Sequence, residues 1–182
     1  MIDPALFHGL TLGLGLLFLV AGAGKLAAPR RFATAVAGYR LLPAAASLPV
    51  AILLAGSEVA AGVAAISFAE RLQSAALAVC AFLLLLYAAA MAINLGRGRR
   101  AVDCGCTTAV TTARAIGWDL VLRNGVLACL ATAAAALGTT ERGLIWLDAV
   151  TSTGIASILL VAYATIETIF ALGRKPRRRA AI

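Results

Sequence analysis

The sequence predicts an all-α integral membrane protein, a bundle of about five transmembrane helices; its composition, the length of its apolar runs and the placement of its charges all indicate this. Of its 182 residues, 62% are hydrophobic and 13% are charged, and the mean hydropathy is +0.96. A soluble domain carries about 25% charged residues. A domain of this size leaves roughly a third of its chain surface exposed. An apolar fraction this large cannot be buried in a soluble core, and lipid must therefore be part of the solvent. The length fits one transmembrane domain over residues 1–182.

Five apolar runs are long enough to cross a bilayer, since a spanning helix needs about 20 mostly apolar residues. They cover residues 4–26, 44–68, 72–95, 117–137 and 143–172. The bilayer core offers the backbone no hydrogen-bond partners. Helices, which satisfy their own backbone, are therefore the expected form of all five runs.

The basic residues predict how the bundle is oriented. If the five helices alternate in direction, the first and third connections and the basic tail 173–182 share one side of the membrane. The fourteen basic residues assigned to that side are Lys25, Arg30, Arg31, Arg40, Arg97, Arg99, Arg100, Arg114, Arg123, Arg174, Lys175, Arg177, Arg178 and Arg179. Only Arg71 and Arg142 fall on the other side. Because basic residues concentrate on the cytoplasmic side, we expect a cytoplasmic carboxyl terminus, an outer amino terminus and a bacterial-type inner (cytoplasmic) membrane.

The formal net charge of +8 does not indicate nucleic-acid binding. The charges lie between and beyond the apolar runs, where they face anionic lipid head groups. The connection 27–43, with arginines among apolar residues, predicts an interfacial helix. Residues 1–8 contain no Lys or Arg, and the apolar run there is longer than that of a signal peptide, so we expect no cleaved leader.

Asp103-Cys104-Gly105-Cys106 is the sharpest chemical signal in the chain. Two cysteines separated by one glycine can close a very small disulfide ring, because glycine relieves the backbone constraint. A strained disulfide is easily reduced and suits thiol–disulfide exchange, and the nearby arginines favour the thiolate. The pair is therefore a redox candidate, while transient metal binding and two unpaired thiols remain alternatives. Because His8 is the only histidine and lies far in the sequence from Cys104 and Cys106, no zinc site is predicted.

Other candidate residues lie inside the predicted helices. Cys80 and Cys129 fall at nearly the same depth of the third and fourth runs, so they could form a second redox pair or could each be a small apolar filler. Glu58 lies near the middle of the second run, where an ionisable side chain costs about 3 kcal/mol, so it is a functional candidate. A hydrogen bond to a neighbouring helix is the alternative role for Glu58. Asp119 and Arg123, four residues apart, predict a local ion pair.

Small residues in the first run predict close helix packing. Gly9 and Gly13 are four residues apart, and Gly22 and Gly24 follow later in the same run. This spacing would let a neighbouring helix approach closely. Chance pairs of this kind in an alanine- and glycine-rich helix are the alternative.

The order of these motifs resembles the family of the methylamine utilisation protein MauE, which is related to the DoxX-like membrane proteins. The matching segments are Ala21-Gly22-Ala23-Gly24-Lys25-Leu26, Phe32 and Tyr39 before Leu42-Pro43, Glu58, Asn94-Leu95 before Arg97-Gly98-Arg99, Asp103-Cys104-Gly105-Cys106, and Arg123-Asn124. Each segment alone is weak evidence for the family, and the resemblance depends on the order and spacing of all of them. One departure is Thr107-Thr108, where the family continues the Cys-Gly-Cys motif with Phe-Gly.

The resemblance implies an inner-membrane protein that works with a thioredoxin-like partner, MauD, in disulfide formation in the small subunit of methylamine dehydrogenase. It implies a thiol–disulfide oxidoreductase-like role for Cys104 and Cys106. Because the charges put this pair on the cytoplasmic side, electrons would cross the bilayer, the loop would fold into the bundle, or the cytoplasm would supply reductant. A non-enzymatic scaffold and a carrier that uses Glu58 are the competing functions. The sequence leaves open whether a quinone binds.

Overall fold

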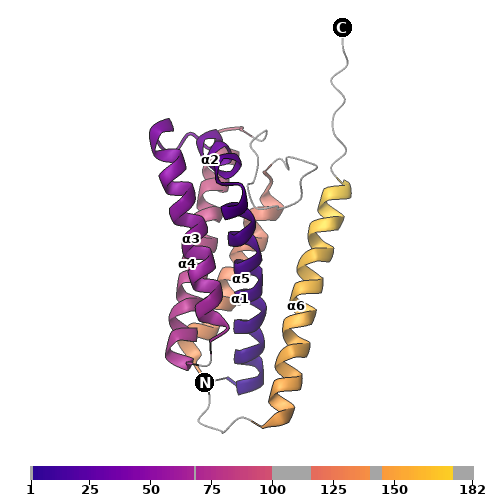
Figure 1. Ribbon diagram of the computed structural model, residues 1–182. Coiled ribbons are helices and arrows are strands. Elements are labelled where there is room, and N and C mark those ends of the chain that lie inside the picture. Colours follow the sequence, from indigo (N-terminus) through magenta and orange to yellow (C-terminus); the bar gives the residue numbers. More distant parts are fainter. Residues whose placement is uncertain (1, 68, 100–115, 140–144, 174–182) are drawn as a thin grey trace.

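A computed structural model describes residues 2–67, 69–99, 116–139 and 145–173 of the chain (Figure 1). All regular elements in these ranges are helical. They are α1 (Pro4–Ala27), α2 (Pro29–Gly38), the short 3-10 helix η1 (Ala44–Ala46), α3 (Ser47–Ala65), α4 (Glu70–Gly96), α5 (Trp118–Leu137) and α6 (Trp146–Gly173). Within the described residues, five helical segments are long and apolar enough to span a membrane, which confirms the predicted all-helical membrane fold.

The predicted helix boundaries are close to those of the structure, with two differences. The second apolar run begins with η1 before it continues as α3, and it ends at Ala65 rather than at residue 68. The connection 27–43 contains a helix, as predicted, and its buried side chains include Phe32, Ala33 and Ala35. These residues pack with Ala51 and Ala55 of α3.

Local signals explain where the helices begin and end. At the start of α1, an Asp3 carboxylate oxygen accepts a hydrogen bond from the Ala5 backbone N–H at 2.9 Å, and Pro4 occupies the first turn. Both are favourable helix starts, because the first backbone N–H groups lack helical partners. The end of α5 is marked by Gly138, whose φ of 59° is in the left-handed region that glycine adopts without steric cost.

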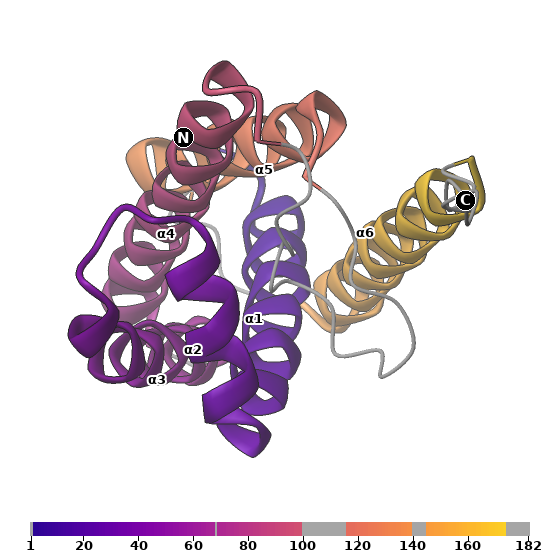
Figure 2. The ribbon, with the colours of Figure 1, turned by 90° about the horizontal axis from the view of Figure 1, so that it is seen from above.

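Helix α1 lies at the centre of the bundle, packed against α3 on one side and α6 on another (Figure 2). Helix α4 packs against both α3 and α5. At the upper end of the bundle in Figure 1, α2 packs against α3. Helix α6 stands apart from α3, α4 and α5, and its upper half diverges from α1 (Figures 1 and 2).

Glycines on two faces of α1 bring its neighbours close. A Cβ atom at Gly9 would lie 2.7 Å from Ile155 Cβ, and one at Gly13 would lie 3.3 Å from Ala156 Cα, both in α6. On the α3 side, a Cβ atom at Gly22 would lie 2.9 Å from the Ala55 carbonyl oxygen. Contacts below 3.0 Å leave no room for a side chain. The predicted close packing of the first helix is therefore present on both faces.

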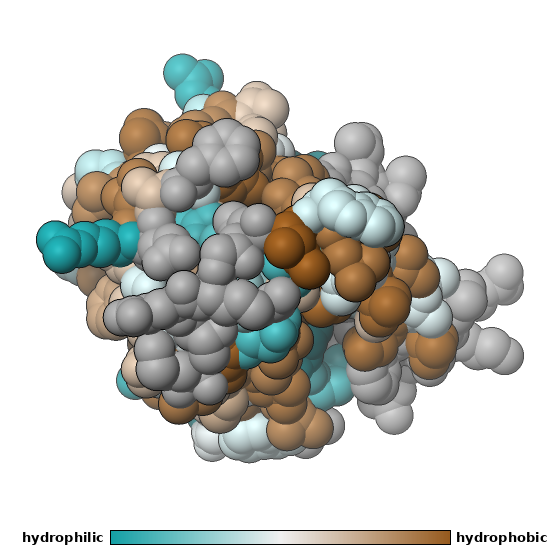
Figure 3. Space-filling view, turned by 90° about the horizontal axis from the view of Figure 1, so that it is seen from below, coloured by the Kyte–Doolittle hydropathy of each residue, from teal (hydrophilic) through white to brown (hydrophobic). Residues whose placement is uncertain are grey.

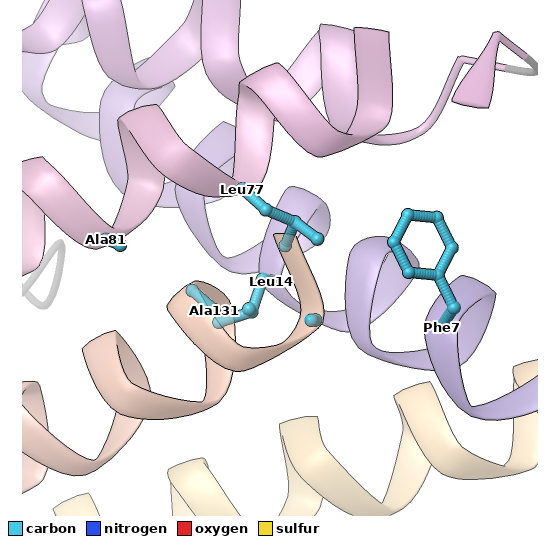
Figure 4. Packing of buried hydrophobic residues seen from close by; sticks show 6 residues of the cluster. Phe7, Leu14, Leu77, Ala81 and Ala131 are labelled. Atoms are coloured by element: carbon cyan, nitrogen blue, oxygen red, sulfur yellow. The ribbon is translucent and has the colours of Figure 1, made fainter. Parts of the chain in front are cut away.

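Apolar side chains from α1, α4 and α5 form one core of the bundle. Figure 4 shows Phe7 and Leu14 of α1 beside Leu77 and Ala81 of α4 and Ala131 of α5. All five are buried. At the end of the bundle near the amino terminus, the visible surface is mainly hydrophobic with scattered hydrophilic side chains (Figure 3). Large apolar side chains along the spanning helices are exposed as well, such as Leu53 of α3 and Ile158 of α6, which suits a bundle whose sides contact lipid.

Candidate functional site

Three polar side chains from three helices meet in the interior of the bundle. The Lys25 ammonium of α1 donates to Glu58 Oε1 of α3 and forms an ion pair with it. The Tyr87 hydroxyl of α4 donates to the same oxygen at 2.6 Å. Glu58 is only 1% exposed and Lys25 is 7% exposed, so the charges are shielded from the surroundings. We call these three residues the buried triad.

The packing of α1 against α3 makes the triad possible. Gly22 lies three residues before Lys25, and a Cβ atom there would come within 2.9 Å of Glu58 Cβ. The missing side chain lets the two helices approach until the lysine reaches the carboxylate. Lys25 is also in the last turn of α1, where the helix dipole favours a positive charge.

Aromatic rings complete the surroundings of the Lys25 ammonium. The nitrogen lies 4.7 Å from the centre of the Tyr87 ring and 5.0 Å from that of Phe32 in α2. A cation over an aromatic face is stabilised by about 2 kcal/mol or more when the site is desolvated. The rings and the carboxylate together offset the cost of burying the ammonium.

A second ion pair joins α5 to the distal half of α6. Arg123 Nη1 donates to Glu167 Oε1 at 2.6 Å, and both side chains are mostly shielded. The guanidinium also donates to the Asn124 side-chain oxygen at 3.2 and 3.3 Å and lies 4.9 Å from the Tyr163 ring centre. This pair therefore connects α5 to the half of α6 that diverges from α1.

A cavity of about 620 Å³ lies between the two ion pairs. Its walls are mainly apolar side chains of α1, α5 and α6, such as Leu17, Leu127 and Leu160. Lys25, Glu58 and Tyr87 line it, and so do Arg123, Asn124, Tyr163 and Glu167. Its size and largely apolar lining with a few convergent polar groups are typical of a small-molecule site.

One buried oxygen of the triad lacks a protein partner. Glu58 Oε1 accepts from both Lys25 and Tyr87, whereas Glu58 Oε2 is buried without a hydrogen bond to any of the residues described. A buried acceptor without a partner costs about 1–3 kcal/mol. The second carboxylate oxygen is therefore a buried acceptor that none of the described residues satisfies.

The structure does not bring Cys80 and Cys129 together as a pair. Both are free thiols. Cys80 is fully buried in α4 among Phe18 of α1, Leu83 and Ala128, whereas Cys129, next to Ala128 on α5, is exposed. In this arrangement Cys80 packs as a small apolar side chain.

The predicted redox pair Cys104 and Cys106 lies outside the residues that the structure describes. The segment that contains it begins after α4, which ends at Gly96, and leads to α5, which starts at Trp118. Both helix ends lie at the upper end of the bundle in Figure 1, as does the end of α1 that contains Lys25. In the described parts of the chain, no three His, Cys, Asp or Glu side chains cluster as metal ligands.

Sequence reasoning found Glu58 but missed its partner. It counts Lys25 and Arg123 among the cytoplasmic charges, whereas the structure buries Lys25 against Glu58 and sets Arg123 against Glu167. Without these two, twelve of the fourteen basic residues still belong to the basic side. The signal that could have found the pair is a lysine and a glutamate in adjacent apolar runs, because opposite charges inside a membrane bundle tend to pair.

The chain is similar to proteins of one family. The family model described as "Methylamine utilisation protein MauE" matches residues 3–138, a range that includes Lys25, Glu58, Cys104 and Cys106. The methylamine utilization protein MauE of Paracoccus denitrificans is 40% identical over 135 residues, which cover 74% of this chain and 71% of that protein.

Two further relatives extend the similarity beyond α5. The MauE protein of Methylophilus methylotrophus is 33% identical over 165 residues, 91% of this chain and 86% of the relative. The MauE protein of Paracoccus versutus is 33% identical over 176 residues, 97% of this chain and 91% of the relative. No solved structure matches the chain.

Proposed function

The chain belongs to the family of the methylamine utilisation protein MauE, and on that premise we propose that it serves methylamine utilisation as a thiol–disulfide redox factor. Its five membrane-capable helices make it a multi-pass membrane protein. The observation that supports the redox role is the Cys104-Gly105-Cys106 motif, which falls within the range that matches the family. The proposed task is maturation of an exported protein, such as the methylamine dehydrogenase small subunit, together with a thioredoxin-like partner.

The proposed chemistry is a dithiol–disulfide exchange. A partner thiolate attacks one sulfur of the Cys104–Cys106 disulfide, and a mixed disulfide forms as the other cysteine leaves as a thiolate. The second partner thiolate then attacks the mixed disulfide, which forms the partner's disulfide and releases the second cysteine. Two electrons pass from the partner to the pair. The exchange is favourable if the small ring is strained, because strain makes a disulfide more oxidising.

We infer the orientation of the protein from its charges. Arg97 and Arg99 follow the end of α4, at the end of the bundle where α2 lies, and the positive-inside rule assigns this end to the cytoplasm. The membrane is then the inner membrane of a bacterial-type cell. For an exported substrate, this orientation requires electrons to pass along the bundle or the motif to reach into it.

Complementation of a strain that lacks the protein tests the function. We expect Cys104→Ser and Cys106→Ser each to abolish maturation of the partner while the protein still inserts, because either change prevents the disulfide. The matched control is Cys80→Ala with Cys129→Ala, which removes the same number of thiols and should preserve maturation. If the double variant Cys104→Ser, Cys106→Ser supported maturation, the chain would be a scaffold rather than a redox factor.

A further inference from the structure

We propose that the cavity between α1, α5 and α6 binds the head group of a lipid-soluble quinone, between the buried triad and the Arg123–Glu167 pair. The role of the quinone as electron acceptor for the thiol pair rests on the proposed function. The binding of the quinone rests on the cavity alone.

The cavity opens where a membrane-soluble ligand would enter. Val20 of α1 is 62% exposed and Ala164 of α6 is also exposed, and both line the cavity, so the site reaches the surface between these two helices. Both helices belong to membrane-capable segments. A ligand arriving here comes from the lipid, and its apolar tail can remain between the two helices.

The charges in the lining favour a neutral head group. Lys25 and Arg123 supply two cations, and Glu58 and Glu167 supply two carboxylates, each in an ion pair with one of the cations. A phospholipid phosphate or a fatty-acid carboxylate would have to displace one of these carboxylates from its cation. Breaking a buried pair in this way is costly, because it leaves a buried charge without its partner.

The hydrogen-bonding groups suit both redox states of a quinone. The oxidised form has two carbonyl acceptors, and the Lys25 ammonium and the Arg123 guanidinium, which both line the cavity, supply donors for them. The reduced form has hydroxyl donors, and the carboxylates of Glu58 and Glu167 line the cavity as acceptors. The rings of Tyr87 and Tyr163 line the same space and can pack against the planar head group.

A quinone here would complete the redox cycle. The reduced pair, with thiols on Cys104 and Cys106, gives two electrons and two protons to the quinone. The products are the Cys104–Cys106 disulfide and the quinol. The quinol then leaves into the lipid through the gap at Val20 and is reoxidised elsewhere in the membrane.

Photolabelling tests the site directly. The purified full-length protein in phosphatidylcholine nanodiscs is labelled with a short-chain azidoquinone, in competition with unlabelled decylubiquinone. We expect labelled peptides from α1 near Val20 and from α6 near Tyr163. Val20→Trp should raise the competing concentration by at least about tenfold, because the indole fills the space that the head group needs.

The matched control is Val150→Trp on α6. Val150 is 61% exposed, like Val20, and does not line the cavity. It should change the competing concentration by less than about twofold, since exposed substitutions away from a site have small effects. Thermal unfolding checks that both variants are folded. Labelling that is spread over the lipid-facing surface, or that is equal in the two variants, would overturn the quinone site.

The outcome for the site can be separated from the outcome for the proposed function. If Cys104 and Cys106 change redox state in cells but Val20→Trp and Val150→Trp label alike, the quinone site is wrong and the redox role stands. If labelling is specific but the thiol pair never changes redox state, the site stands and the redox role fails.

Discussion

Lys25 of α1 and Glu58 of α3 form a buried ion pair across two helices, with the Tyr87 hydroxyl on the same carboxylate oxygen. Each charge alone would be expensive at this depth, by about 3 kcal/mol for a charged side chain inside a membrane helix. Paired, they neutralise each other and fix the position of α1 against α3. The same contact holds the Glu58 side chain beside the cavity that it lines.

Removing one member of the pair should destabilise the protein. We expect Glu58→Gln or Lys25→Met to lower the free energy of unfolding by about 3 kcal/mol, because either change leaves a buried charge without its partner. The measurement is unfolding of the purified protein in detergent, followed by tryptophan fluorescence. Arg31→Met, which removes an exposed cation, is the control and should have little effect.

The double variant Lys25→Met, Glu58→Leu separates a charge effect from a packing effect. Replacing a buried pair with apolar residues of similar volume is often nearly neutral. We therefore expect the double variant to be more stable than Lys25→Met alone or Glu58→Leu alone. Single effects that simply add would contradict a direct interaction between the two side chains.

Close packing at Gly22 gives a second prediction. Gly22→Ala should lower the free energy of unfolding by about 1–3 kcal/mol, because the added methyl group meets the Ala55 carbonyl oxygen and the Glu58 side chain. Gly56→Ala on α3 is the matched control, since a Cβ atom there meets nothing within 4 Å. The control should be neutral or slightly stabilising, because alanine favours a helix by roughly 0.5–1 kcal/mol over glycine. Equal effects at both positions would contradict the packing described.

The Arg123–Glu167 pair should act as the tether of the distal half of α6. Near its start, α6 is held by contacts with Gly9 and Gly13 of α1. We expect Arg123→Gln to increase hydrogen exchange in residues 160–169, because the ion pair that joins this half to α5 is lost. Arg97→Gln, at an exposed position, should leave that exchange unchanged. Unchanged exchange in Arg123→Gln would show that the tether is dispensable.

The buried thiol and the exposed thiol should stay reduced. After treatment of the membranes with a mild oxidant and denaturation, Cys80 and Cys129 should both react with an alkylating reagent, because one faces the core and the other the surroundings. Mass spectrometry of the alkylated peptides measures this. A peptide pair linked through Cys80 and Cys129 would contradict the arrangement of α4 and α5.

The spanning helices could be predicted from the sequence, because a run of about 20 apolar residues has few other stable forms in lipid. Glu58 could be singled out for the same reason, since a carboxylate is conspicuous in such a run. Its partner could not be assigned, because pairing Lys25 with Glu58 requires knowing which faces of two helices meet. Apolar runs show little such preference, since nearly every face of a membrane helix is hydrophobic.

The Arg123–Glu167 contact could not be predicted from the sequence for a related reason. Four-residue spacing within one helix suggested Asp119 as the partner of Arg123, whereas Glu167 is distant in sequence and is brought near only by the path of α6. The cavity could not be predicted from the sequence either, because its presence depends on how far α6 diverges from α1. Local spacing predicts contacts within a helix, and only the three-dimensional arrangement gives contacts between helices.

The redox state of Cys104 and Cys106 in living cells tests the central claim most directly. Cells that produce the protein are quenched with acid, and free thiols are tagged with a reagent that shifts the mass of the chain. A redox factor should show both dithiol and disulfide forms, and the disulfide fraction should fall when the partner that is matured accumulates in its reduced form. A pair that stays fully reduced under every condition, in a chain that still supports maturation, would contradict the redox function.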